Sequence, residues 1–84
     1  MINSSIAIGS KCAQYSVSDF GAGLDLTRNG LSARRIVLKE AGTLRAVEDD
    51  GSEIVLTGLP QWYVHDSATR AILPGQQAAL IVYW

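Results

Sequence analysis

Short runs in which apolar and polar residues alternate fill the chain between Ala33 and Gly58, and compact turn signals separate them. Alternation with a period of two is typical of β-strands that bury one face. The clearest turn signal is the acidic stretch Glu48–Ser52, which interrupts two strand-like runs and contains Gly51. The pattern therefore predicts a β-hairpin at the centre of the fold.

Two registers are open to this hairpin. A two-residue loop at Asp50 and Gly51 places Glu48 opposite Glu53, which is unfavourable for like charges. A three-residue loop from Asp49 to Gly51 avoids that contact. It pairs Glu48 with Ser52, Ala46 with Ile54 and Leu44 with Leu56, and it leaves Arg45, Val47, Glu53 and Val55 on the opposite face. We predict the second register, with Gly51 in the left-handed position of a G1 bulge.

Further strands are expected on both sides of the hairpin. Besides 43–48, which is the first strand of the hairpin, the runs with strand character are 33–39, 61–65, 69–73 and 78–84. The last of these is apolar at every position, which is typical of a strand covered on both faces. Before residue 18, weak alternation around Ile6, Ile8 and Cys12 predicts one or two edge strands, and a glycine-containing loop follows, with a tight turn at Asn29-Gly30.

Nowhere does a window of about 11 residues hold helical apolar spacing without a Gly or Pro. The predicted fold is therefore all-β, a small antiparallel β-sandwich or barrel of about six short strands with no long helix. We expect one domain over residues 1–84, in which 1–32 form an extended segment and glycine-rich loop and 33–84 form the β core.

Composition suggests that the chain has partners. Of its 84 residues, 48% are hydrophobic and 18% charged, more apolar surface than so small a domain buries alone, so a homo-oligomer is expected. The formal net charge of -1 disfavours direct nucleic-acid binding. The single cysteine, Cys12, is expected to be a reduced, half-buried residue, and no spacing of Cys and His indicates zinc. No signal peptide or membrane span is evident, so we expect neither secretion nor a membrane partner.

Candidate chemistry is sparse. His65 has Asp66 and Ser67 beside it, but neighbouring side chains in an extended chain point to opposite faces, so a surface turn is expected rather than a catalytic triad. The acidic group around Glu48 lacks the spacing of a calcium loop and is interpreted as a solvated hairpin tip. We therefore expect no enzymatic activity, no catalytic residue, no metal and no cofactor.

The remaining candidates are interface residues. Aromatic side chains and arginines anchor protein interfaces, and so small a domain has little interior for two tryptophans. Only one arginine of the pair Arg34 and Arg35 can face a given partner, and salt links across a subunit boundary are the favoured role. The predicted subunit or capsid interface consists of Arg34, Arg35, Trp62, Tyr63, Arg70, Ile81, Tyr83 and Trp84.

Several short motifs resemble a family of very small phage virion proteins, best known as the base proteins of head spikes on tailed phages and gene transfer agents. The resemblance runs from Ser16 to Trp84 and rests on Val17-Ser18-Asp19, Ala33-Arg34-Arg35-Ile36-Val37, Ala41-Gly42-Thr43-Leu44 followed by Gly51, Leu59-Pro60 and the closing Ile81-Val82-Tyr83-Trp84. The chain departs from the family after Pro60, where Gln61–Thr69 replaces a glycine and a second proline and only Arg70 remains of an arginine-rich strand.

This resemblance implies a non-enzymatic structural protein of a bacteriophage virion that forms a symmetric homo-oligomer and docks on the major capsid protein or another virion protein. A head-spike base, a vertex or a cement (decoration) role, or a place in the tail or baseplate, are all open. The implied location is the virion, after synthesis in the host cytoplasm. The alternative is a glycan- or receptor-binding β-module that uses Trp62 and Tyr63 as a stacking platform.

Overall fold

The computed structural model describes residues 11–84, and within this range the chain is all-β, as predicted, with eight short strands and a single turn of 3-10 helix. The strands are β1 (Cys12–Tyr15), β2 (Leu24–Asp25), β3 (Arg35–Leu38), β4 (Gly42–Glu48), β5 (Glu53–Leu59), β6 (Val64–His65), β7 (Thr69–Ile72) and β8 (Leu80–Tyr83), and the 3-10 turn η1 is Val17–Phe20. The part of the expected N-terminal strands around Ile6 and Ile8 lies outside the described residues.

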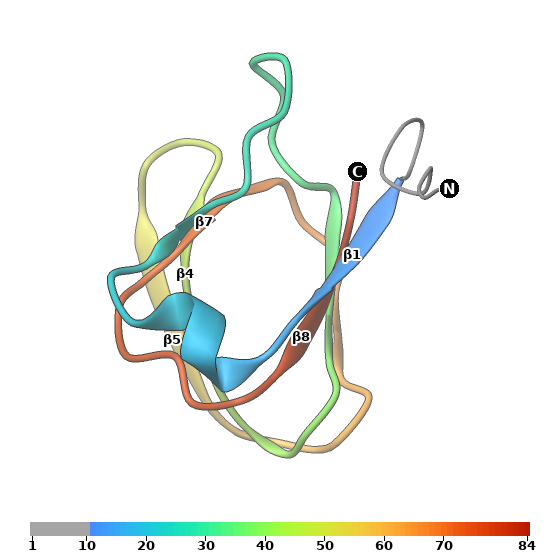
Figure 1. Ribbon diagram of the computed structural model, residues 1–84, viewed down its shortest axis with the longest axis vertical. Coiled ribbons are helices and arrows are strands. Elements are labelled where there is room, and N and C mark those ends of the chain that lie inside the picture. The colour runs from blue at the N-terminus through green and yellow to red at the C-terminus, as the bar shows by residue number, and fades with distance from the viewer. Residues whose placement is uncertain (1–10) are drawn as a thin grey trace.

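The strands form two four-stranded antiparallel sheets, which Figure 1 shows on opposite sides of a common core. The strand order is β1-β8-β3-β6 in the first sheet and β2-β7-β4-β5 in the second. At one end the sheets are joined by a bridge in which Ala33 and Thr69 exchange two backbone hydrogen bonds of 2.8 and 2.9 Å. The architecture is therefore a β-sandwich whose two sheets are hydrogen-bonded to each other at one end.

The central hairpin has the predicted register. Leu44 lies opposite Leu56 and Ala46 opposite Ile54. The Glu48 amide donates to the Ser52 carbonyl at 2.8 Å, and Gly51 has a φ of +91°. This is the left-handed conformation expected for the bulge position of a three-residue loop.

The core lies between the sheets and is formed by aliphatic side chains from both, together with one phenylalanine. Two of its members, Phe20 and Leu26, come from the segment before Ala33, and the Tyr15 ring lies 6.4 Å from that of Phe20. The fully buried hydrophobic cluster is Phe20, Leu26, Ala33, Ile36, Leu38, Leu44, Ala46, Ile72, Ala78, Leu80 and Val82. Segments before the hairpin thus complete the interior that the hairpin strands begin.

The expected strand at 61–65 is wrong over most of its length, because only Val64 and His65 are extended. Trp62 has a φ of +68° and its amide donates to the Leu38 carbonyl at 2.8 Å. The Tyr63 amide turns back to the Pro60 carbonyl at 3.2 Å. A turn after Pro60 therefore occupies the first half of this segment.

The closing strand β8 is central in its sheet, between β1 and β3. Leu80 and Val82 are fully buried against the core, whereas Ile81 and Tyr83 on the outer face are only half-buried. The expectation of cover on both faces therefore holds for the inner face alone. Within residues 11–84 no helix has the length and apolar character needed to cross a bilayer.

Candidate docking surface

The solvent-facing side of the first sheet gathers apolar side chains around β8. Because side chains alternate along a strand, the residues paired with buried neighbours face the core and those between them face outward. We call the outward set the β8 face. Its members are Cys12, Gln14, Arg35, Val37, Val64, Ile81 and Tyr83.

Strand pairing arranges the β8 face in two rows. Ile81 is paired with Gln14 on one side and with Val37 on the other, and Val37 is in turn paired with Val64, which is 48% exposed. This row has three adjacent aliphatic side chains across β8, β3 and β6. Adjacent side chains on one sheet face are the unit through which a sheet presents a continuous apolar surface.

Charged groups border this apolar row. Arg35 lies opposite Tyr83 in the second row, and its Nε is 3.5 Å from Oδ1 of Asp66. The Lys39 ammonium donates to Oε1 of Gln14 at 2.7 Å. Both contacts are solvent-exposed, so they orient the side chains at the rim and add little stability.

The structure brings together only part of the predicted interface set. Arg35, Ile81 and Tyr83 share the β8 face. Arg34 is exposed just before β3, and its amide donates to the Tyr83 carbonyl at 2.9 Å. The two neighbouring arginines are thus not a joint basic patch, and Arg35 has its acidic contact within the chain.

The loop aromatics and Arg70 lie elsewhere. Trp62 is 56% exposed in the turn before β6, whereas Tyr63 packs against the core. Arg70 is on β7 of the second sheet, where its guanidinium donates to the Asp49 carbonyl at 2.7 Å. Trp62 and Tyr63 therefore do not form a flat stacking platform.

Trp84 is half-buried and packs against the core rather than extending β8 into solvent. Its indole Nε1 donates to the Leu26 carbonyl, and the Arg28 guanidinium lies 3.5 Å from the centre of the ring. The Trp84 amide also donates to the Lys11 carbonyl at 2.8 Å. These contacts tie the end of the described chain to the loop that follows β2.

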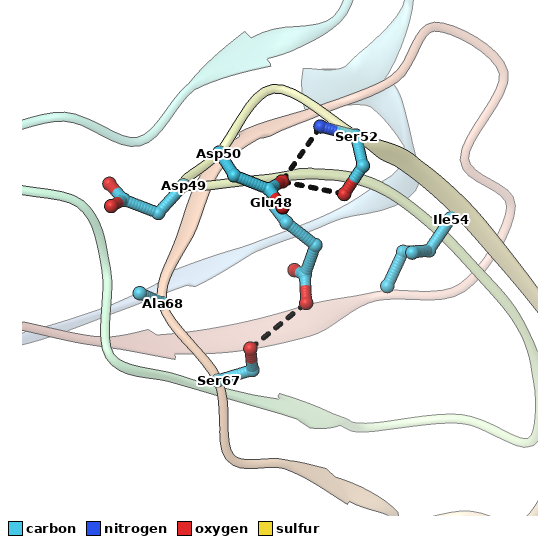
Figure 2. Close-up of a pocket in the computed structure, with 7 residues that line it drawn as sticks. All are labelled: Glu48, Asp49, Asp50, Ser52, Ile54, Ser67 and Ala68. Atoms are coloured by element: carbon cyan, nitrogen blue, oxygen red, sulfur yellow. Dashed lines mark hydrogen bonds between the residues drawn. The ribbon is translucent and has the colours of Figure 1, made fainter.

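A shallow depression of about 390 Å³ lies beside the tip of the hairpin, and Figure 2 shows Glu48 reaching from β4 across it toward Ser67. The Glu48 carboxylate accepts hydrogen bonds from Ser67 at 2.9 Å and Thr69 at 3.1 Å, and it lies 3.2 Å from Nε2 of His65. The side chains of His65 and Glu48 are only 11% and 18% exposed. Glu48 is therefore not part of a solvated tip, and His65 is not in a surface turn.

This cluster is a link between the sheets rather than a nucleophile and its base. Glu48 belongs to the second sheet and His65 to the first, so their contact spans the open edge of the sandwich. His65, Ser67 and Thr69 all contact the carboxylate, so three side chains of the same chain hold it in place. Among residues 11–84, no group of three or more His, Cys, Asp or Glu side chains is placed to hold a metal ion.

The rest of the hairpin tip is exposed and ordered by its own hydrogen bonds. Oδ1 of Asp50 accepts the Ser52 hydroxyl at 2.6 Å and the Ser52 amide at 2.9 Å, as Figure 2 shows. These two bonds favour the charged carboxylate and lower the pKa of Asp50 from its usual value near 3.8.

Sequence reasoning did not single out Val37 and Val64 as interface candidates. Val37 shares one side of its predicted strand with Arg35 and Lys39. An apolar residue on the polar side of a strand could have indicated an interface. Val64 carried no such signal in the sequence, because its pairing with Val37 comes from the long-range contact of β3 with β6. The expectation for Cys12 is wrong, since it is exposed on β1, whose inward positions are taken by Ala13 and Tyr15.

The fold has a counterpart among solved structures. The chain is similar to one in a structure described as the capsid of a native GTA particle computed with C5 symmetry. The match covers 74% of this chain and 80% of the other, with a TM-score of 0.53 and 15% sequence identity. No family model and no curated protein matches the chain by sequence. At this identity the similarity establishes a shared fold.

Proposed function

We propose that the protein is a structural component of a phage-like virion that docks on capsid protein and has no enzymatic role. The observation that carries the proposal is the fold shared with a chain of a GTA capsid over most of both chains. The motif resemblance to head-spike base proteins of tailed phages and gene transfer agents was reached from the sequence alone and supports the same assignment. A head-spike base or a cement position on the capsid surface fits this assignment best.

We assign docking on capsid protein to the β8 face. A row of aliphatic side chains bordered by charged residues has the composition of a protein interface, with an apolar centre and a polar rim. The aliphatic row is short, so a single copy has a small apolar contact. A symmetric homo-oligomer presents several such faces at once, and simultaneous contacts raise avidity without strong individual ones.

Purified particles test the assignment. We expect the protein to co-purify with particles and to appear on the capsid in an image reconstruction. Val64→Lys places a charge in the aliphatic row and should reduce incorporation at least tenfold. Leu31→Lys is the matched control, because Leu31 is 70% exposed at the turn after Arg28 and lies off the β8 face.

Both variants should keep the wild-type melting temperature, because Leu31 is 70% and Val64 48% exposed and neither belongs to the buried core. Particles that lack the protein, or density for it in the tail or baseplate, would overturn the capsid assignment. Equal incorporation of the two variants would remove the β8 face from the docking contact.

We do not propose the glycan-binding alternative as a second function. Its stacking platform required Trp62 and Tyr63 side by side, and Tyr63 packs against the core. The exposed Trp62 alone offers one ring.

A further inference from the structure

The longest exposed edge of the sandwich belongs to β5. This strand runs for seven residues, Glu53–Leu59, and is the last strand of its sheet. Within residues 11–84, β4 is the strand to which it is hydrogen-bonded, and its other edge meets no strand. Figure 1 shows β5 at the outer side of the sheet that contains β7 and β4.

The apolar side chains of β5 are incompletely covered. Leu44 and Ala46 on β4 are fully buried, yet their paired residues Leu56 and Ile54 on β5 are only half-buried. On the other face of the strand Val55 is 51% exposed. A further strand alongside β5 would cover the open flanks of all three side chains.

The ladder shows which backbone groups of β5 point outward. The Glu48 amide donates to the Ser52 carbonyl, whereas the Ser52 amide donates to Oδ1 of Asp50, so the ladder begins at the turn with a single backbone bond. Along an antiparallel ladder, hydrogen-bonded pairs alternate with non-bonded ones. Counting in steps of two from the Ser52 carbonyl, residues 54 and 56 direct both their amide and carbonyl groups toward β4. Glu53, Val55 and Thr57 direct theirs away from it.

Nothing on β5 blocks this edge. Proteins protect exposed edges with prolines, lysines, bulges or very short strands. The strand contains neither proline nor lysine, and its one charged residue, Glu53, is at its start. The regular part ends at Gly58, whose φ of +68° turns the backbone out of the extended conformation.

We propose that β5 pairs with β5 of a second copy of this chain, antiparallel across a two-fold axis at Val55. In this register Val55 lies opposite Val55 of the second copy, Ile54 opposite Leu56, and Glu53 opposite Thr57. Every apolar side chain meets an apolar one, and the glutamate meets a hydroxyl. The pairing uses the regular stretch 53–57 and stops before Gly58, and it joins two four-stranded sheets into one of eight strands.

Centring the axis one residue further along is less favourable. That register brings Gly58 into the ladder opposite Ile54 and sets Glu53 against Leu59. The contact proposed at β5 deepens the homo-oligomer part of the proposed function. It lies on the opposite sheet from the β8 face, so both contacts can be made at once.

Val55→Lys tests the contact in the purified full chain by sedimentation equilibrium. Two ammonium groups at the axis should raise the dimer dissociation constant at least tenfold. Leu31→Lys is the control, because it places a lysine at an exposed apolar residue that lies outside both β5 and the β8 face. It should leave the dissociation constant unchanged, and circular dichroism should show both variants folded.

Disulfide formation tests the register. In a Cys12→Ser background, Val55→Cys should cross-link on mild oxidation, because residues in a hydrogen-bonded antiparallel pair have Cα atoms about 5.5 Å apart, within disulfide reach. Thr57→Cys should not link to itself, whereas Glu53→Cys combined with Thr57→Cys should link.

A wild-type chain that stays monomeric at high concentration would overturn the proposal, as would efficient self-linking by Thr57→Cys without linking by Val55→Cys. Particle incorporation is measured separately. A protein that dimerises but never enters particles would contradict the virion role and support the β5 contact. A protein that enters particles as a monomer would support the virion role and contradict the β5 contact.

Discussion

The strands β8 and β5 differ in how much of the molecule holds them. β8 has four residues and lies between β1 and β3, so both of its edges are paired and its inner side chains are fully buried. β5 has seven residues, one paired edge, and apolar side chains that are half-exposed. The longer strand is thus the less covered one.

This difference teaches that the length of a strand does not measure how firmly the rest of the fold holds it. β8 is apolar throughout and central in its sheet, so neighbouring strands hold it along both edges. β5 is held by its pairing with β4 and by the turn at the hairpin tip, and its other edge is unpaired within the described residues. Four measurements sharpen the contrast, ordered by expected effect.

The largest effect is expected from truncating the centre of β8. Leu80→Ala should lower the free energy of unfolding by about 3 to 4 kcal/mol, because the residue is fully buried and its removal leaves a cavity. Leu56→Ala on β5 should cost about half as much, since Leu56 is already partly solvated. Urea denaturation of both variants makes the comparison, and equal losses would show that β5 is as well covered as β8.

The second-largest effect is expected at the Glu48 carboxylate, which links the two sheets. Glu48→Ala should cost about 1 to 3 kcal/mol, because it removes the acceptor that Ser67 and Thr69 share and leaves the fully buried Thr69 with one fewer bond. Glu40→Ala, at an exposed turn, is the control. Thermal unfolding measures both, and a Glu48 variant as stable as the Glu40 variant would contradict a structural role for the carboxylate.

The hairpin turn is tested by Gly51→Val. A β-branched residue at a φ of +91° is strained, so we expect a loss of about 1 to 2 kcal/mol. An added Cβ meets no atom within 4 Å, so the loss measures backbone strain alone. Gly51→Asn is the control, because asparagine tolerates the left-handed region. An unchanged melting temperature for the valine variant would contradict the bulge.

The smallest effect is a pH dependence at the same turn. The pKa of Asp50 is lowered in the folded chain, so its contribution to stability is present above its unfolded value and is lost as the pH falls through the folded value. Asp50→Asn keeps the acceptor oxygen and removes the titration. The stability difference from wild type should therefore shrink as the pH drops below about 4. A difference that stays constant from pH 7 to pH 3 would contradict it.

Local patterns were enough to predict the all-β class, the three-residue hairpin loop and the turn at Asn29-Gly30, where Asn29 and Gly30 both have positive φ. The like-charge repulsion between Glu48 and Glu53 chose the hairpin register, and it acts between residues close in sequence. The predicted strand around Trp62 failed because aromatic content indicates a strand only when the backbone is free to extend. Here bonds to Leu38 and Pro60 bend it.

Local patterns could not predict which residues share the β8 face. Arg35, Ile81 and Tyr83 share a face because β3 pairs with β8, a contact between residues more than 40 positions apart in the chain. Trp84 and Tyr63, which were predicted at an interface, are partly buried against the core, and their interface role stays a prediction. Nothing local distinguishes an aromatic ring that covers its own core from one that covers a neighbour.

The amino-acid sequence by itself determined the hairpin loop, the turn at Asn29-Gly30 and the alternation of side chains along the hairpin, because backbone strain and neighbouring charges act over a few residues. Only the tertiary structure decided how much of each side chain is buried. Gln76 shows this best, since a polar residue in a loop is 1% exposed and its amide bonds the backbone of Arg45 and Thr43 beside the irregularity in β4. Burial depends on what the whole fold brings alongside, and for β5 the described chain brings a neighbour to one edge only.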